Sequence, residues 1–425
     1  MKENKSASEI LNYWMNAKGS LSVASIKDPD IRMNTALLLE NQRTAPAADI
    51  FEADIGVTNM GSNGGDGARF SPITIALVRR SYYEHFAHRC VGFQTMQGPV
   101  GLAYALRKVY DIPGLPGSST YAGGSDSYEA AFRVLNEYSG YTGSNPGSAL
   151  STATSAIYDP STSSFGRFGT GADTSAAQAW KIGSTMPTLR LFMDKTPIEA
   201  KTRKLAASFS IEAAQDLKSM HNIDMAREML EILAAEIPAE RDREIIGRMM
   251  QASVNTAIGG EAFTNFTVSA SSGRWAQEYF ANLVNVIVKK ANDIALATFR
   301  GAGNFVIVSG RVATALAASG PQFSANTAEV NASTTVTEIG KINGSITVYR
   351  DNQAPSDYAL VGYKGPGISD CGIILSDYVT DLTNKAINPD DFSTRIGVLS
   401  RYSITDSLLG AGRYYRTIKI TGLDT

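Results

Sequence analysis

The chain has 425 residues, of which 43% are hydrophobic and 19% are charged, and its formal net charge is −2. This composition excludes a wholly disordered protein and predicts two or three units that each bury a core. The nearly balanced charge argues against a protein that grips DNA by neutralising phosphates, although such a chain could enclose DNA. No apolar run approaches the roughly 20 residues of a membrane span, and no secretory signal follows the polar residues Met1–Lys5. We therefore expect no membrane partner and synthesis in the cytoplasm.

Residues 1–52 are expected to form a separate helical piece. The capping box Ser6–Glu9 predicts a helix that carries Trp14 on its apolar face, and a second helix is expected over about residues 30–43. The Pro- and Ala-containing run 44–48 then interrupts the helical pattern. Two interpretations stay open: the helices dock on a partner through exposed Trp and Leu side chains, or they pack on the main body of the same chain.

The next stretch is expected to be an extended arm. Residues 55–70 are rich in Gly and Asn and show no hydrophobic periodicity, which is typical of an extended or mobile segment. A helix is predicted after Pro72, because apolar residues then recur with helical spacing as far as Phe86.

Two runs with period-2 alternation predict a pair of strands. Residues 102–107 alternate between large apolar and other residues, and residues 189–193 do the same farther along the chain, followed by a further extended stretch at 198–203. The intervening residues 113–184 are rich in Gly, Ser, Thr and Tyr. Because a structureless loop of that length is improbable in a compact domain, we interpret this region as a projecting β-loop that carries an inserted element.

The clearest helical patterns follow. Ser210 is predicted to cap a short helix, and a much longer helix is predicted from Asp224 to residue 254, with a kink or a break at Pro238. A third helix is expected over residues 275–299. In the short helix, the residues expected to face inward are Ile211, Ala214 and Leu217.

After Gly303 the pattern changes to alternating strands and helices. Short apolar runs predict strands, and Val312–Ala318 predicts a short helix. The strands are expected at residues 305–308, 346–349, 358–363, 373–375, 396–399 and 414–420.

Residues that usually carry catalysis are sparse. His85 and His88 lie three apart on a predicted helix, but no Asp, Glu or Cys is placed to complete a metal set, and His221 is isolated. No phosphate-binding loop of the Walker type and no nucleophile elbow occur. We therefore expect no catalytic residue, no metal, no cofactor and no enzyme activity.

The remaining reactive and charged groups have simple interpretations. Cys90 and Cys371 are the only cysteines, and we interpret them as buried thiols rather than a disulfide framework. An acidic cluster lies among arginines on the long predicted helix, where solvated ion pairs are the simplest expectation. Its members are Glu236, Glu240, Asp242 and Glu244.

The run Ile50-Phe51-Glu52-Ala53 is a candidate proteolytic site. It places an apolar residue two positions before Glu52 and a small residue after it, in a linker flanked by Pro and Ala. A protease that reads an extended strand can gain affinity from main-chain pairing and specificity from alternate side chains, here Ile50 and Glu52. The pattern also falls where the composition changes. By itself, a pattern of four residues remains only a candidate site for such a protease.

Several blocks, taken together and in order, resemble the major capsid proteins of T4-like tailed bacteriophages. They cover most of the chain, and their joint occurrence is far more specific than any single block. The blocks are Ala53–Gly56, Leu77–Arg80, Gln97–Arg107, Ile198–Leu205, Ser210–Leu217, Gly303–Ile307 and Val361–Pro366.

The resemblance implies an α+β, HK97-like phage capsid fold, with an N-arm, an extended E-loop that carries an insertion, a peripheral domain with a long spine helix, and an axial domain. The implied divisions are a scaffold-binding propeptide (1–52), the N-arm (53–72), the start of the peripheral domain and the first E-loop strand (73–110), the E-loop insertion (111–186), the return strand (187–204), peripheral-domain helices (205–300), the axial domain (301–395) and closing strands of the peripheral domain (396–425).

The resemblance also implies a function and partners. The chain would assemble with itself into hexameric capsomers, and these would contact one another in a virion shell that encloses double-stranded DNA without sequence-specific binding. The implied partners are the vertex protein, an internal scaffold, the prohead protease, the portal and possible decoration proteins. The prohead protease would remove residues 1–52 by cutting between Glu52 and Ala53, and this maturation would release an expansion of the shell.

Two related shell proteins stay open as alternatives: the paralogous capsid vertex protein, which forms pentamers, and an encapsulin-like cellular nanocompartment shell. The sequence departs from the family pattern in two places. The insertion is shorter and richer in Ser and Gly than in familiar relatives, and residues 403–414 are abbreviated. No residue argues for covalent cross-linking between subunits.

Overall fold

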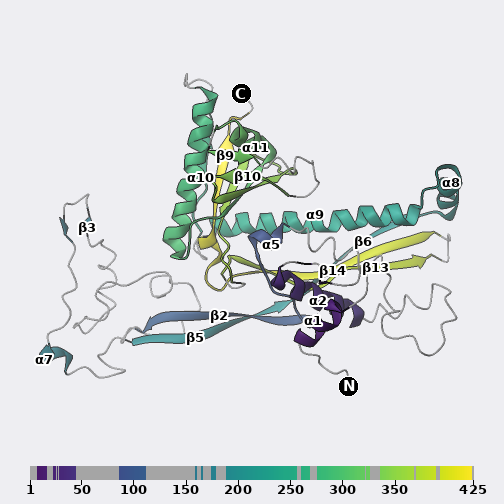
Figure 1. Ribbon diagram of the computed structural model, residues 1–425, viewed down its shortest axis with the longest axis horizontal. Helices are drawn as coiled ribbons and strands as arrows, with labels where there is room; N and C mark the ends of the chain where they lie inside the picture. The colour runs from purple at the N-terminus through teal and green to yellow at the C-terminus, as the bar shows by residue number, and fades with distance from the viewer. Residues whose placement is uncertain are drawn as a thin grey trace.

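The computed structural model is an elongated α+β molecule built from two main sheets, a long two-stranded hairpin and several helices (Figure 1). A seven-stranded sheet and a four-stranded sheet hold most of the strands. The structure describes residues 7–16, 23–44 except 25 and 27, 86–111, 158–159, 164–165, 174–178, 188–255, 260–268, 275–320, 322–325, 336–367, 370–388 and 393–423.

The seven-stranded sheet is mixed. Its order is β7-β15-β12-β8-β11-β10-β9; β8 runs parallel to β11 and β7 parallel to β15, and the other neighbours are antiparallel. The strands are β7 (Thr264–Thr267), β8 (Phe305–Ser309), β9 (Phe323–Ala325), β10 (Thr337–Ile342), β11 (Ile346–Asp351), β12 (Tyr358–Gly362) and β15 (Tyr415–Thr421), and the 3-10 helix η8 (Ala411–Tyr414) precedes the last.

Both faces of this sheet are covered by helices, which explains its continuous apolar strands. Along β8 the side chains alternate: Phe305 and Ile307 join a core with α9 (Met225–Val254), whereas Val306 and Val308 join a second core with α10 (Ala276–Thr298) and α11 (Gly310–Ala317). A strand buried on two faces has no polar side to alternate with. The helices α10 and α11 were predicted within two residues of their observed bounds.

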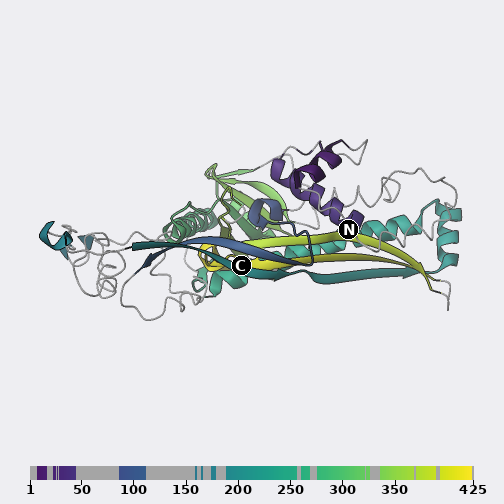
Figure 2. The same cartoon turned by 90° about the horizontal axis from the view of Figure 1, so that it is seen from below.

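The four-stranded sheet lies along the long helix. Its order is β1-β13-β14-β6, and Ile396 and Val398 of β14 pack against Leu233 and Ile237 of α9 (Figures 1 and 2). At 1.5 Å per residue, the 30 residues of α9 extend about 45 Å along it. The strands are β1 (Gly92–Phe93), β6 (Lys201–Phe209), β13 (Ile373–Ile387) and β14 (Thr394–Asp406), and the short helix α5 (Ala87–Cys90) comes directly before β1.

The long helix begins as predicted but is not broken. The Asp224 carboxylate accepts a hydrogen bond of 3.1 Å from the Ala226 amide and so caps the first turn. The helix then runs without interruption through Pro238, so the expected break there is wrong. Proline lacks the N–H that bonds to the preceding turn, but Ile237 and Ala239 on either side of it are buried, and this packing holds the helix across the missing bond.

The predicted β-loop is an antiparallel hairpin of β2 (Val100–Asp111) and β5 (Thr188–Glu199), paired along their whole length. It projects away from the two main sheets (Figure 1). Within residues 113–184, the described elements are β3 (Tyr158–Asp159), β4 (Ser164–Phe165) and α7 (Thr174–Ala177).

The N-terminal helices α1 (Ala7–Met15) and α2 (Pro29–Thr44) pack on each other and on the body of the chain. Trp14 is 4% exposed and lies with Leu39 in a small core between the helices, so the expectation of an exposed Trp and Leu surface is wrong. Leu38 instead joins the large core beneath α9 and the seven-stranded sheet. Of the two interpretations left open, packing on the main body is the one observed.

The sheets cross the boundary expected between residues 395 and 396. β13 and β14 lie on opposite sides of it, yet they pair as one antiparallel hairpin in the four-stranded sheet. β15, on the C-terminal side, belongs to the seven-stranded sheet beside β12. The chain therefore enters the four-stranded sheet with β13 and returns to the other sheet with β15.

Candidate assembly surfaces

One face of the β2–β5 hairpin carries a stripe of exposed apolar side chains. The register pairs Tyr104 with Lys195, Leu106 with Met193 and Lys108 with Leu191. Directly paired residues point to the same face, so the even positions of β2 and the odd positions of β5 share one side. The stripe consists of Val100, Leu102, Tyr104, Leu189, Leu191 and Met193, each at least 40% exposed.

The opposite face is closed where the hairpin meets the body. Ala103 and Ile198 are buried there against Met96, and the Ala200 amide donates a hydrogen bond of 2.9 Å to the Pro99 carbonyl. The hairpin therefore has an anchored base and an apolar face that the described residues leave exposed. An apolar surface of this extent on a folded chain indicates an interaction site, because leaving it in water costs free energy.

A second apolar surface lies at the far end of the long helix, around α8 (Ile211–His221) (Figure 1). Ser210 caps α8 as predicted, with its Oγ accepting from the Ala213 amide at 3.2 Å. Asn222 ends it with a left-handed backbone (φ 53°), and Asp224 then starts α9. Of the residues expected to face inward, Ile211 is exposed, Ala214 and Leu217 are half-buried, and no residue of α8 is fully buried.

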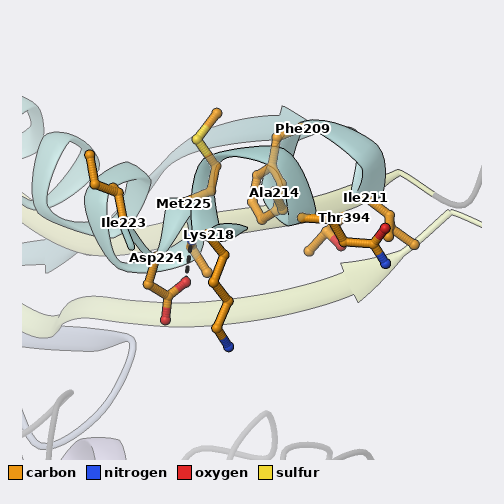
Figure 3. A pocket seen from close by; sticks show the side chains of 10 residues that line it. Phe209, Ile211, Ala214, Lys218, Ile223, Asp224, Met225 and Thr394 are labelled. Carbon is orange, nitrogen blue, oxygen red and sulfur yellow. Dashed lines mark hydrogen bonds between the residues drawn. The ribbon is translucent and has the colours of Figure 1, made fainter. Parts of the chain in front are cut away.

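The apolar side of α8 instead borders an open groove of about 240 Å³ (Figure 3). Phe209, Ile211, Ile223 and Met225 form most of its apolar lining. Lys218 and Asp224 are its charged residues, and the Asp224 carboxylate is already engaged in capping α9. This lining suits an apolar side chain better than an anionic ligand.

A layer of charged groups lies between α9 and the four-stranded sheet. Arg241 of α9 lies 3.6 Å from the carboxylate of Asp377 in β13, and both side chains are almost completely buried. Glu244 accepts hydrogen bonds from Arg203 and, at 2.8 Å, from the Tyr402 hydroxyl. These contacts cross from the helix to β6, β13 and β14.

Asp242, next to Arg241 on α9, is also buried. Burial raises its pKa to about 8, although the neighbouring Arg241 cation acts in the opposite direction. The interpretation of the acidic cluster as solvated ion pairs is therefore wrong for Asp242, while Glu236 and Glu240 are exposed. Sequence reasoning missed the layer because β13, which covers it, is distant in sequence.

The remaining candidates for chemistry are arranged as structural groups. His88 stacks on Phe93 with ring centroids 4.0 Å apart, and His221 ends α8. Cys90 and Cys371 are buried, and burial raises the pKa of both thiols, that of Cys371 to about 12, so they stay protonated at neutral pH. Across the described ranges, no cluster of three His, Cys, Asp or Glu side chains could hold a metal ion.

The predicted cleavage residues Ile50, Glu52 and Ala53 lie outside the described residues, as does His85. The helix expected after Pro72 also falls there, apart from Phe86. Among the helices of the described part of the chain, none is long and apolar enough to cross a membrane.

The comparisons with known proteins agree on one family. The family model "Major capsid protein Gp23" matches residues 67–420. The major capsid protein of Enterobacteria phage T4 is 28% identical over 481 aligned residues, covering 94% of this chain and 91% of that protein. The major capsid protein of Salmonella phage ViI is 30% identical over 384 residues, which cover 87% of this chain and 83% of that protein.

More distant similarities extend to a vertex protein and to solved capsids. The capsid vertex protein of phage T4 is 23% identical over 235 residues, or 51% of this chain and 52% of that protein. A structure titled "Mycobacterium phage Bobi" is 9% identical with a TM-score of 0.43, covering 80% of this chain and 91% of that one. The capsid of Myoviridae phage XM1 is 8% identical with a TM-score of 0.40, and the match covers 78% of this chain and 89% of that one.

The family match, the relatives and the architecture are consistent with one another. The expected α+β, HK97-like organisation is confirmed in its main parts, since the long hairpin, the long helix and the separate mixed sheet are all present. Two apolar surfaces that the described part of the subunit leaves uncovered suit a protein whose working state is an assembly. The chain belongs to the family of the phage major capsid protein Gp23, structural proteins that build the virion shell.

Proposed function

We propose that this chain tiles the shell as closed hexameric rings, and that its hairpin stripe is buried on a neighbouring subunit. The observation that carries the proposal is the face with Leu189, Leu191 and Met193, which no part of the described chain covers. A ring needs a heterologous contact, in which one patch meets a different patch on the next copy. The groove beside α8 supports this, because it is a separate apolar patch at the other end of the molecule (Figure 1).

The parts of the subunit have proposed roles. The α9 helix and the four-stranded sheet form the peripheral domain, and the seven-stranded sheet with α10 and α11 forms the axial domain at the capsomer centre. In this assignment β13 belongs to the peripheral domain and β15 to the axial one, following their hydrogen-bonded neighbours. Residues 53–72 are the N-arm, and residues 111–186 are the insertion of the E-loop.

Maturation is proposed to begin with cleavage by the prohead protease between Glu52 and Ala53. Residues 1–52 carry six basic and seven acidic side chains, so their removal changes the net charge by about one unit. Processing therefore acts through lost contacts and freed volume rather than bulk electrostatics. The removed segment engages the internal scaffold before cleavage, and its loss permits the shell to expand as DNA enters.

The other proposed partners are the vertex protein, the portal and decoration proteins. The net charge of −2 supports a shell that encloses double-stranded DNA without gripping it. We propose no enzyme activity and no cofactor. A major capsid role is favoured over a vertex role because the alignment with T4's major capsid protein covers 94% of the chain, against 51% for its vertex protein.

Mass spectrometry of purified particles tests the proposal. The intact subunit mass should correspond to a chain that begins at Ala53, and the particle mass should require hexamers of this subunit over most of the surface. Copies confined to five-fold vertices would support the vertex alternative. Particles built only of uncleaved chain, without other virion proteins, would support a nanocompartment shell.

A further inference from the structure

We propose that helix α2 is a latch that holds the base of the β2–β5 hairpin in the precursor, and that removing the N-terminal segment releases the hairpin. The inference rests on the proposed function in one respect: it takes cleavage after Glu52 as the releasing step. The latch itself is built from contacts between α2, the loop before β2, and β13.

The central contact is made by one side chain. The Asn41 amide nitrogen donates to the Met96 carbonyl at 2.8 Å and to the Tyr378 carbonyl at 3.0 Å. Met96 precedes β2, and Tyr378 belongs to β13, so a single amide of α2 bridges the hairpin base to the four-stranded sheet. Bonding both N–H groups of one amide to two carbonyls fixes its position on the body.

The Tyr378 carbonyl is suited to this contact by an irregularity in β13. The pairing of β13 with β14 shifts register between Asp377 and Val379 and again between Val379 and Leu382. A bulge leaves the extra residue outside the regular ladder, and here the Tyr378 carbonyl bonds to Asn41. The Met96 amide bonds to the neighbouring Asp377 carbonyl at 2.9 Å, which ties the loop to the same bulge.

Two further contacts extend the latch. The Thr95 hydroxyl donates to the Asn34 side-chain oxygen at 2.6 Å, one residue from the Met96 contact. Leu38, between Asn34 and Asn41 on α2, is fully buried in the core of the body. Residues 34, 38 and 41 recur with helical spacing, so one face of α2 makes all of these contacts.

Met96 transmits the contact to the hairpin. Its side chain is buried with Ala103 of β2 and Ile198 of β5. It also fits closely over Gly101, where an added Cβ would lie 3.1 Å from the Met96 sulfur. The latch thus holds the main chain of Met96, and the Met96 side chain supports the hairpin. Losing α2 therefore loosens the hairpin at its base rather than along its length.

Cleavage releases the latch because the contact with the body is small. While α2 is covalently attached, it meets the body as part of the same molecule, and cleavage turns this contact into an association between two molecules. The described contact joins buried Leu38, the partly buried Ile31 and three neutral hydrogen bonds, which is small for an association that must persist once the tether is cut. The hairpin is then free to settle on a neighbouring subunit.

Hydrogen exchange on the full-length chain, produced without the protease, tests the latch. Asn41→Ala removes both amide bonds, and amides at residues 94–104 and 196–200 should exchange about tenfold faster. Asn12→Ala is the matched control, since the same substitution on α1 alters an exposed side chain, and it should leave these amides unchanged. Faster exchange in α2 with no change at the hairpin base overturns the proposal.

Two additions keep the test decisive. If Asn41→Ala does not fold, Asn34→Ala removes one bond and should accelerate the same amides about threefold; an unchanged hairpin base then overturns the latch. Subunits dissociated from particles matured with the protease should show the base exchange of Asn41→Ala, and protection equal to that of the full-length chain would overturn the latch. Particles whose subunits keep residues 1–52 would contradict the proposed cleavage. The comparison of the full-length wild type with Asn41→Ala would still stand, so a failure of the cleavage proposal can be told from a failure of the latch.

Discussion

The guanidinium of Arg241 and the carboxylate of Asp377 lie 3.6 Å apart between α9 and β13, with both side chains almost completely buried. Removing one partner of such a pair leaves an uncompensated buried charge. We therefore expect Asp377→Leu to lower the free energy of unfolding by about 3 kcal/mol or more. Urea unfolding of the unassembled subunit measures the change. The double variant Arg241→Met/Asp377→Leu should recover most of the loss, and a double variant as unstable as the single one would contradict this view.

The contribution of Asp242 to the stability of the subunit should fall as the pH rises from about 4 to about 8. Burial raises the pKa of Asp242 from 3.8 to about 8, so over this range the folded chain binds a proton that the unfolded chain has released. Stability is highest where Asp242 is protonated in both states and decreases until the folded carboxyl ionises.

Asp242→Asn, whose amide resembles the protonated acid, should flatten this dependence. Thermal unfolding of both chains between pH 5 and pH 9 checks it, and the variant should gain most at the alkaline end. The matched control is Glu240→Gln on the exposed side of the same helix, which should keep the wild-type profile. Parallel profiles for the wild type and Asp242→Asn would exclude a buried neutral carboxyl.

Assembly should depend on the apolar face of the hairpin. Leu191 is 60% exposed, so Leu191→Asp should change the unfolding free energy by less than about 0.5 kcal/mol. In an interface the new carboxylate would be buried without a partner, and shells should not form. Electron microscopy and sedimentation report particle yield. Leu191→Ile keeps the apolar surface and should assemble normally; wild-type yields from Leu191→Asp would place the interface elsewhere.

Blocking the cleavage should arrest maturation. Glu52→Ala removes the acidic side chain that is predicted to precede the scissile bond, and its particles should keep residues 1–52 and stay unexpanded. Intact-mass measurement and particle diameter are the readouts. Asp49→Ala, in the same linker, should be processed like the wild type. Expanded, DNA-filled heads built from uncleaved Glu52→Ala chains would disprove the link between processing and expansion.

Two glycines should respond oppositely to alanine. A Cβ at Gly362 in β12 would lie 2.2 Å from the Phe305 ring, so Gly362→Ala should destabilise the fold by about 1–3 kcal/mol. Gly247, in the interior of α9, has open space where a Cβ would stand, and Gly247→Ala should stabilise by about 0.5–1 kcal/mol. Thermal unfolding compares the two, and equal effects would argue against the packing of β12 on β8.

Elements whose signals lie within a few residues of one another were predictable from the sequence. Ser210 and Asp224 cap the helices expected of them, and the alternation at Leu102 and Leu189 predicts strands that the structure shows paired. Phe305–Val308 also reads correctly as a strand, since a short apolar run between turns suits a strand covered on both faces. Capping and periodicity depend on neighbours in the chain, which the sequence displays directly.

What covers each element was decided by the tertiary structure. The same apolar alternation leaves Leu191 in solvent, and the amphipathic pattern of α8 meets an open groove instead of a core. Asp242 is buried near Asp351 of β11, and Asn41 bonds to the carbonyls of Met96 and of Tyr378 in β13, all of which are distant in sequence from their partners. Periodicity identifies an apolar face but not the segment that packs on it. That segment lies far away in the sequence or, as we propose for the hairpin, belongs to another copy of the chain.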